Sequence, residues 1–192
     1  MFIHVHWWLL LTTLAWCFRT QAQQIERPGF GLQVGDHAPA FTLKDQNNQE
    51  VSLEALLKKG PVAVVFYRSA GWCMFCKFEL KHLQNNLKEF EAAGGQVVGV
   101  SYDAIPVLKR FADSQHITLP LLSDEGSKTI DAYSVRDQSR TGAPGCAGHA
   151  AFVVDQKGII RARFLDAIYQ EQPGIGLLVK ALKDARSPEA KS

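Results

Sequence analysis

The chain has 192 residues, of which 46% are hydrophobic and 21% are charged, with 21 Lys and Arg against 19 Asp and Glu. This composition excludes a disordered or collagen-like chain. The net charge of +2 gives no basic field for nucleic-acid binding, so we expect no nucleic-acid partner. The length predicts one domain with short extensions.

The first 22 residues have the pattern of a secretory signal peptide. Residues 7–18 are uncharged and mostly apolar, which is the length of a signal-peptide core and short for a membrane span. Thr20 and Ala22 place small residues before a cleavage point after residue 22. We therefore expect an exported, periplasmic protein. The alternatives are an uncleaved segment that anchors the chain to the membrane and a buried apolar helix.

The rest of the chain predicts one domain with polar flanks. Residues 23–34 are polar and contain Gly and Pro, as is typical of a linker. The domain is expected over residues 35–186, and the polar residues 187–192 form a tail.

Hydrophobic patterns and turn residues predict the elements of this domain in chain order. They are a hairpin around 41–51, a helix over 53–59, a strand over 61–67, a helix from Cys73 to Gly94, a strand over 96–102, a helix over 105–114, a strand over 119–122, a helix over 124–133, a loop over 135–148, a hairpin of 151–154 and 159–164, and a helix over 175–185. Helices between strands require parallel strand pairs, and the last hairpin adds an antiparallel pair, so the fold class is α/β.

Cys73 and Cys76 carry the predicted chemistry. They follow a buried strand at the start of a helix whose apolar stripe runs through Cys76, Leu80 and Leu83. One turn of helix separates the two cysteines, so their side chains are neighbours, with Cys73 at the exposed helix start and Cys76 beneath it. The unpaired amides and the dipole of the helix N-terminus favour the thiolate of Cys73. This pattern predicts a redox couple, with a structural disulfide and a metal site as alternatives.

Three stretches of the chain resemble the peroxiredoxin-like (AhpC/TSA, redoxin) branch of the thioredoxin superfamily. They are residues 35–43, residues 65–76 with the Trp-Cys-x-x-Cys motif, and residues 152–161. Together the similarity spans about residues 34–185. It implies a thioredoxin-like three-layer α/β/α sandwich with a mixed central sheet and an N-terminal extension.

The resemblance departs from the family pattern in three places. Cys73 stands where peroxiredoxins have a Thr or Ser, Met74-Phe75 replaces the proline-containing pairs common between thioredoxin-type cysteines, and His149 replaces a proline. Cys76 is the better positional match to the family's peroxide-reactive cysteine, and Arg68 stands near a proline position of that site. If peroxide is the substrate, Cys76 is therefore an alternative to Cys73 as the attacked residue. His149 stands where thioredoxin-like folds have a cis-proline, and because a cis bond is costly without proline we expect a trans bond there. His149 is expected close to Cys73, where it could stabilise a thiolate or transfer a proton; the alternative is a loop histidine without a role.

The loop that contains Cys146 and His149 supplies the remaining candidates. Cys146 is a second resolving cysteine, a free thiol or a residue without a role. Cys73, Cys76, Cys146 and His149 also form a set of three cysteines and one histidine that suits tetrahedral zinc. Trp72 is expected to pack as a lid beside Cys73.

These observations predict an exported thiol–disulfide oxidoreductase or thiol-dependent peroxidase that acts through the Cys73/Cys76 couple. Its substrate is a protein disulfide or a peroxide, and its electrons come from a thioredoxin-like reductant or a small thiol. No bound cofactor is expected, because the sequence lacks a Gly-rich nucleotide loop. The alternative is a metal-binding or metal-delivery module. The sequence carries no signal for an oligomeric state.

Overall fold

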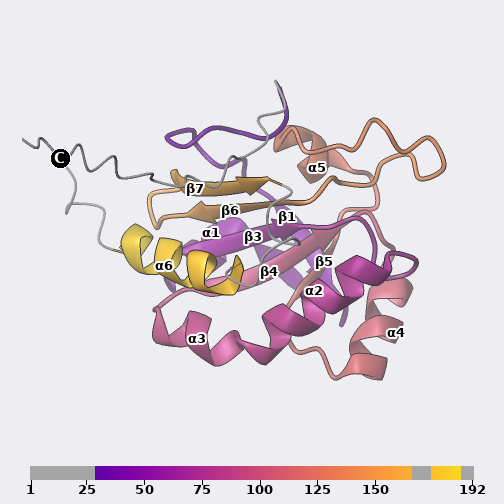
Figure 1. Cartoon of the computed structure of the whole chain (residues 1–192), viewed down its shortest axis with the longest axis horizontal. Coiled ribbons are helices and arrows are strands. Elements are labelled where there is room, and N and C mark those ends of the chain that lie inside the picture. The colour runs from indigo at the N-terminus through magenta and orange to yellow at the C-terminus, as the bar shows by residue number, and fades with distance from the viewer. Residues whose placement is uncertain (1–28, 166–173, 187–192) are drawn as a thin grey trace, which may run out of the picture.

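The computed structural model describes residues 29–165 and 174–186 (Figure 1). The predicted signal peptide over 1–22, residues 23–28 of the predicted linker and the predicted tail over 187–192 lie outside the described residues. In the part that is described, no helix is both long enough and apolar enough to cross a membrane.

Among the described residues, seven strands form one sheet. They are β1 (Thr42–Asp45), β2 (Glu50–Ser52), β3 (Val62–Phe66), β4 (Gln96–Ser101), β5 (Leu121–Ser123), β6 (Ala150–Val154) and β7 (Ile160–Leu165). The strand order is β2-β1-β5-β4-β3-β6-β7, with β4 parallel to both β3 and β5 and every other pair antiparallel. The sheet is mixed, as the sequence predicts. The strands β3 and β6 are continuous apolar runs that are buried along their length, as expected for central strands.

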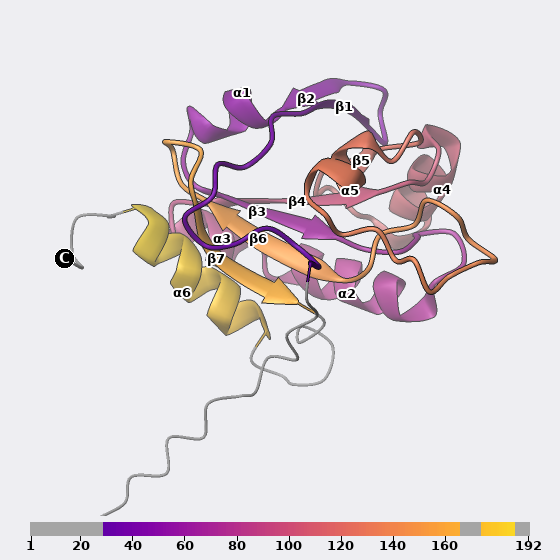
Figure 2. The ribbon, with the colours of Figure 1, turned by 90° about the horizontal axis from the view of Figure 1, so that it is seen from above.

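The helices cover both faces of the sheet. They are α1 (Leu53–Leu57), α2 (Met74–Asn85), α3 (Leu87–Ala92), α4 (Ile105–Gln115), α5 (Lys128–Ala132) and α6 (Gly174–Arg186). Figure 2 shows α2, α3 and α6 on one face and α1 and α5 on the other. Side chains of α4 share the core of the α2 face, so the predicted three-layer α/β/α sandwich is confirmed.

The helix predicted from Cys73 to Gly94 is two helices. Asn86 separates α2 from α3, and its side-chain amide donates a hydrogen bond to the carbonyl of His82 (2.7 Å). Leu83 before the break and Phe90 after it are both buried. The apolar stripe therefore faces the sheet on both sides of the break, as the predicted periodicity requires.

The helix predicted over 124–133 is shorter than expected, because α5 begins only at Lys128. Asp124 is buried, and its carboxylate accepts a hydrogen bond from the backbone N–H of Ile130 (2.8 Å). Ser127 has a left-handed backbone with φ 54°. The residues before Lys128 therefore form a turn that caps the helix instead of extending it.

Part of the predicted linker packs onto the domain. Phe30 and Leu32 lie against the core of the α1 face, and the backbone N–H of Gly31 donates to the carbonyl of Ser134 (2.8 Å). Gly31 has a φ of 74°, and a Cβ atom there would lie 3.0 Å from the Leu165 side chain. Glycine is the residue that accepts both the conformation and the close approach.

Candidate active site

The site begins in the loop that follows β3, and a buried carboxylate fixes this loop. Asp103 lies just past the end of β4, which is parallel to β3. Its two oxygens accept hydrogen bonds from the Ser69 hydroxyl (2.7 Å) and the Ala70 backbone N–H (2.6 Å). The Ser101 hydroxyl donates to the same carboxylate (3.0 Å). These bonds hold the chain that leads into Cys73 against the end of the sheet.

Cys73 and Cys76 form a disulfide at the N-terminus of α2, with their Cα atoms 5.3 Å apart. Cys73 is the N-cap residue, and its Sγ accepts a hydrogen bond from the backbone N–H of Cys76 (3.3 Å). The helix has 12 residues, so its dipole and its unpaired amides act on this sulfur. The predicted proximity of the two sulfurs at one helix end is confirmed.

The predicted exposure of Cys73 is wrong, because the residue is buried. Its exposed fraction is 5%, against 0% for Cys76. Cys73 belongs to the apolar cluster that also contains Tyr67, Ala70 and Leu80. Helical periodicity identifies the face that points to the sheet, but it does not reveal what the neighbouring loop covers. Cys73 is nevertheless the more accessible of the two cysteines.

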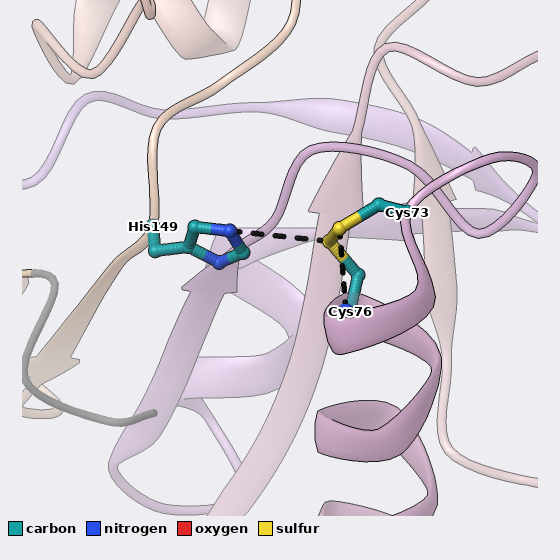
Figure 3. A group of neighbouring side chains, drawn as sticks. All are labelled: Cys73, Cys76 and His149. Atoms are coloured by element: carbon teal, nitrogen blue, oxygen red, sulfur yellow. Dashed lines mark hydrogen bonds between the residues drawn. A yellow bond between two sulfur atoms is a disulfide. The ribbon is translucent and has the colours of Figure 1, made fainter. Parts of the chain in front are cut away.

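His149 reaches the disulfide from the start of β6. The strand register pairs Ala150 with Phe66, the last residue of β3, so the residue before β6 lies beside the loop that leads to Cys73. The Nε2 atom of His149 is 4.0 Å from the Sγ atom of Cys76 (Figure 3). No cis peptide bond occurs among the described residues, so the bond at His149 is trans as predicted.

Glu79 is a site residue that the sequence interpretation missed. It lies in α2 one turn after Cys76, and one carboxylate oxygen is 4.0 Å from the Nδ1 atom of His149. Glu79 is buried, and the loss of solvation raises the pKa of its carboxyl to about 8. The sequence did contain a signal for Glu79, because it lies on the same buried stripe as Cys76, Leu80 and Leu83. Burying a charged side chain is costly, so its presence there indicates a role.

Four exposed apolar side chains lie within seven residues of the disulfide segment, and we call them the apolar rim. It consists of Trp72 (47% exposed), Met74 (60%), Phe75 (69%) and Phe78 (64%). The Trp72 indole N–H donates a hydrogen bond to the Tyr102 hydroxyl (2.9 Å), which fixes the ring next to Cys73 in the chain. A pocket of about 460 Å³ lies between Trp72 and residues 139–143. Trp72 is therefore half-exposed at the edge of the site instead of a closed lid.

Cys146 lies in a buried part of the loop before β6. Its thiol is not part of a disulfide, and its backbone carbonyl accepts a hydrogen bond from Asp137 (3.0 Å). Burial first, and the nearby charge of Asp137 second, raise the pKa of this thiol. Asp137 also forms ion pairs with Arg68 (3.7 Å) and Arg140 (3.8 Å). Cys146 is thus kept as a neutral thiol, unlike a cysteine activated for attack.

The four-residue zinc set is not assembled among the described residues. The potential ligand atoms of Cys73, Cys76 and His149 lie within 4.8 Å of one another, and this group does not include Cys146. The two sulfurs in the group are joined in the disulfide, so neither is the thiolate that zinc binds. The metal-binding alternative is therefore not favoured.

The fold and the site together define a class of protein. A disulfide at the N-terminus of the helix after a central strand, in a three-layer sandwich with a mixed sheet, is the arrangement of a thiol oxidoreductase with a thioredoxin-like fold. The crystal structure of the peroxidoxin BcpB from Mycobacterium tuberculosis has the same fold. It matches with a TM-score of 0.72 and 25% sequence identity, over 81% of this chain and 99% of that one.

Sequence comparisons agree with this class. The family model of the AhpC/TSA family matches residues 34–163. Alkyl hydroperoxide reductase E of Mycobacterium tuberculosis is 37% identical over 132 residues, which cover 68% of this chain and 83% of that protein. The chloroplastic peroxiredoxin Q of Suaeda salsa is 32% identical, with 68% of this chain and 58% of that protein covered. The chain belongs to the AhpC/TSA family.

Proposed function

We propose that the protein is a thiol-dependent peroxidase that reduces a hydroperoxide through the Cys73/Cys76 couple. The disulfide at the N-terminus of α2, next to His149, is the observation that carries this proposal. Two relatives, alkyl hydroperoxide reductase E and peroxiredoxin Q, support peroxide as the substrate class. A protein disulfide is the second candidate substrate, because the same couple can exchange with one.

In the oxidising step, the thiolate of Cys73 attacks one oxygen of the hydroperoxide. The O–O bond breaks, the alcohol leaves with a proton, and Cys73 becomes a sulfenic acid. The Cys76 thiol then attacks this sulfur, releases water and forms the Cys73–Cys76 disulfide. Two thiols of a reductant regenerate the dithiol, so each cycle transfers two electrons. We assign the first attack to Cys73 because it is the more accessible sulfur and caps the helix N-terminus.

The apolar rim favours a protein thiol as the reductant. Four exposed apolar side chains within seven residues form a surface that water covers poorly and a second protein surface covers well. Two of these side chains, Trp72 and Met74, directly flank Cys73 in the chain, so a partner thiol bound to Cys73 would lie near them. A thioredoxin-like protein, which brings both a thiol and an apolar contact surface, suits this rim better than a small charged thiol.

Trapping of the sulfenic acid tests which cysteine reacts first. With one equivalent of hydrogen peroxide, Cys76→Ser should accumulate a sulfenic acid at Cys73, whereas Cys73→Ser should lose peroxide turnover and trap little. A sulfenic acid at Cys76 in the Cys73→Ser variant would reverse the assignment. Faster oxidation of the wild type by a protein disulfide than by peroxide would replace the peroxidase with a disulfide oxidoreductase.

We also propose that residues 1–22 direct export to the periplasm and are removed there. The uncharged run over 7–18 and the small residues Thr20 and Ala22 support this proposal. Mass spectrometry of the protein from its native cells tests it. A mature chain that starts at Gln23 in the periplasmic fraction is expected, and a full-length chain in the cytosol would reject export.

A further inference from the structure

Three groups form a chain from the core to the disulfide. A Glu79 carboxylate oxygen is 4.0 Å from His149 Nδ1, and His149 Nε2 is 4.0 Å from Cys76 Sγ. All three residues are buried, and the pair of Glu79 and Cys76 comes from consecutive turns of α2. We propose that the Glu79 carboxyl, acting through His149, supplies the proton that Cys76 takes up when the disulfide is reduced. This inference rests on the proposed dithiol–disulfide cycle.

Cys76 needs such a supply because its sulfur has no exposed surface. When the disulfide opens, Cys76 is the leaving group and would become a thiolate in an apolar core, which is costly without a partner. The imidazole of His149 points toward this sulfur from the start of β6 (Figure 3). Catalytic hydrogen bonds are often long in a resting site and tighten in the reacting complex, so distances of 4.0 Å are compatible with a transfer path.

Glu79 is suited to hold a proton at neutral pH, because burial raises the pKa of its carboxyl to about 8. The phenol of Tyr67, directly after β3, also interacts electrostatically with Glu79. Burial raises the pKa of Tyr67 above its ordinary value, so the phenol stays neutral and does not compete. Asp103 also interacts electrostatically with Tyr67, and its carboxylate accepts a hydrogen bond from the Ser69 hydroxyl.

Reduction of the disulfide begins at Cys73. The thiolate of the reductant attacks Cys73 Sγ, a new S–S bond forms, and the electron pair of the Cys73–Cys76 bond leaves on Cys76 Sγ. His149 donates its Nε2 proton to this sulfur and receives the carboxyl proton of Glu79 at Nδ1. Glu79 ends as a carboxylate and His149 as the Nδ1–H tautomer. In the next oxidation the Cys76 thiol returns its proton to His149 Nε2 and the Nδ1 proton returns to Glu79, while the hydroxide that leaves the Cys73 sulfenic acid takes a proton from solvent. Glu79 touches no reacting atom, so it is a positioning residue that acts through His149.

Reduction of the disulfide by dithiothreitol, measured from pH 6 to 10 without peroxide, tests the proposal. The rate is expressed per dithiothreitol thiolate. At pH 6.5 the Glu79→Gln variant should be about 100-fold slower than the wild type, at the lower end of the effect of one lost proton transfer. The two rates should converge above pH 9, because the wild-type carboxyl has then lost its proton too.

Two further variants separate this role from a structural one. His149→Gln should show a loss of similar size, and adding Glu79→Gln to it should cause no further loss, because both act on one path. Glu91→Gln, an exposed matched control in α3, should equal the wild type at every pH. A Glu79→Gln rate that is lower by the same factor at all pH values, or that equals the wild type at pH 6.5, would overturn the proposal.

The peroxidase proposal can fail independently of this inference. If the protein does not consume peroxide but the reduction rates of the wild type and Glu79→Gln converge above pH 9, the proton path stands and the proposed substrate is rejected. If the protein consumes peroxide but the ratio of the Glu79→Gln rate to the wild-type rate does not change with pH, the proposed substrate stands and the proton path is rejected.

Discussion

The two faces of the central sheet are packed by different kinds of residue. The face under α2 and α6 holds the disulfide, His149 and Glu79 among mostly aliphatic side chains. The opposite face holds an aromatic cluster of Phe66, Tyr133 and Phe152, with ring centroids 4.9 to 6.0 Å apart. Successive residues of one strand point to opposite faces of the sheet, so each strand contributes side chains to both.

This difference shows where the fold places its reactive groups and where it gains stability. In β6, Ala151 faces the reactive side and Phe152 faces the aromatic cluster. Small residues near the disulfide accept buried polar groups, whereas the large rings bury much apolar surface. We therefore expect substitutions on the aromatic face to change the free energy of unfolding, and substitutions on the reactive face to change reactivity and pH dependence.

The largest effect on stability is expected for Phe152→Ala. The variant leaves a cavity between Phe66 and Tyr133, which should lower the free energy of unfolding by about 3–5 kcal/mol. Urea denaturation measures the change, and the matched control is Phe78→Ala, at an exposed ring, with a change within about 0.5 kcal/mol. Equal losses in the two variants would contradict the assignment of the stable face.

The next effect is a pH-dependent stability that comes from Glu79. Its folded pKa of about 8 lies above the unfolded value of 4.5, so the folded state binds the extra proton between these values. The free energy of unfolding should therefore fall as the pH rises from 5 to 8, by about 1 kcal/mol per pH unit. Urea denaturation of the oxidised protein at several pH values should show this slope, and Glu79→Gln should remove it. The same slope in the variant would assign it to another group.

A smaller effect is expected for Asp103→Ala. The substitution leaves the Ser69 hydroxyl and the Ala70 N–H without their acceptor, which should cost about 1–3 kcal/mol. The loop before Cys73 should also loosen, so the thiols of the reduced variant should react faster with iodoacetamide. The control is Asp113→Ala, whose exposed ion pair with Lys109 contributes less than about 1 kcal/mol. An unchanged alkylation rate would show that other contacts hold the loop.

The smallest effect is expected for Cys146→Ala. The side chain is small and buried, and its backbone hydrogen bonds remain, so the loss should be about 1 kcal/mol. The rate of disulfide reduction should not change, because Cys146 is not part of the group around His149. A mixed disulfide between Cys73 and Cys146 in the Cys76→Ser variant would instead make Cys146 a resolving cysteine.

Much of the fold could be predicted because strand and helix periodicities differ. The apolar runs that became β3 and β6 and the stripe of α2 follow directly from residue pattern. The break at Asn86 was not predictable, since the stripe keeps its phase from Leu83 to Phe90. The late start of α5 depends on the Asp124 carboxylate, which caps Ile130 six residues away.

Part of the site could also be predicted from local sequence. Local sequence places Cys73 and Cys76 on adjacent turns, so their contact follows from helix geometry. The approach of His149 needed the thioredoxin-like fold, because 73 residues separate it from Cys76. The burial of Cys73 and the contact of Glu79 with His149 depend on tertiary packing, which no single-segment pattern contains.

The position of Trp72 has a practical consequence. The chain has four tryptophans, at positions 7, 8, 16 and 72, so a protein that starts after residue 22 retains only Trp72. This indole precedes a disulfide sulfur in the chain, and disulfides quench nearby indole emission. The intrinsic fluorescence of a chain that starts after residue 22 should therefore rise when the disulfide is reduced, so that its emission reports the redox state.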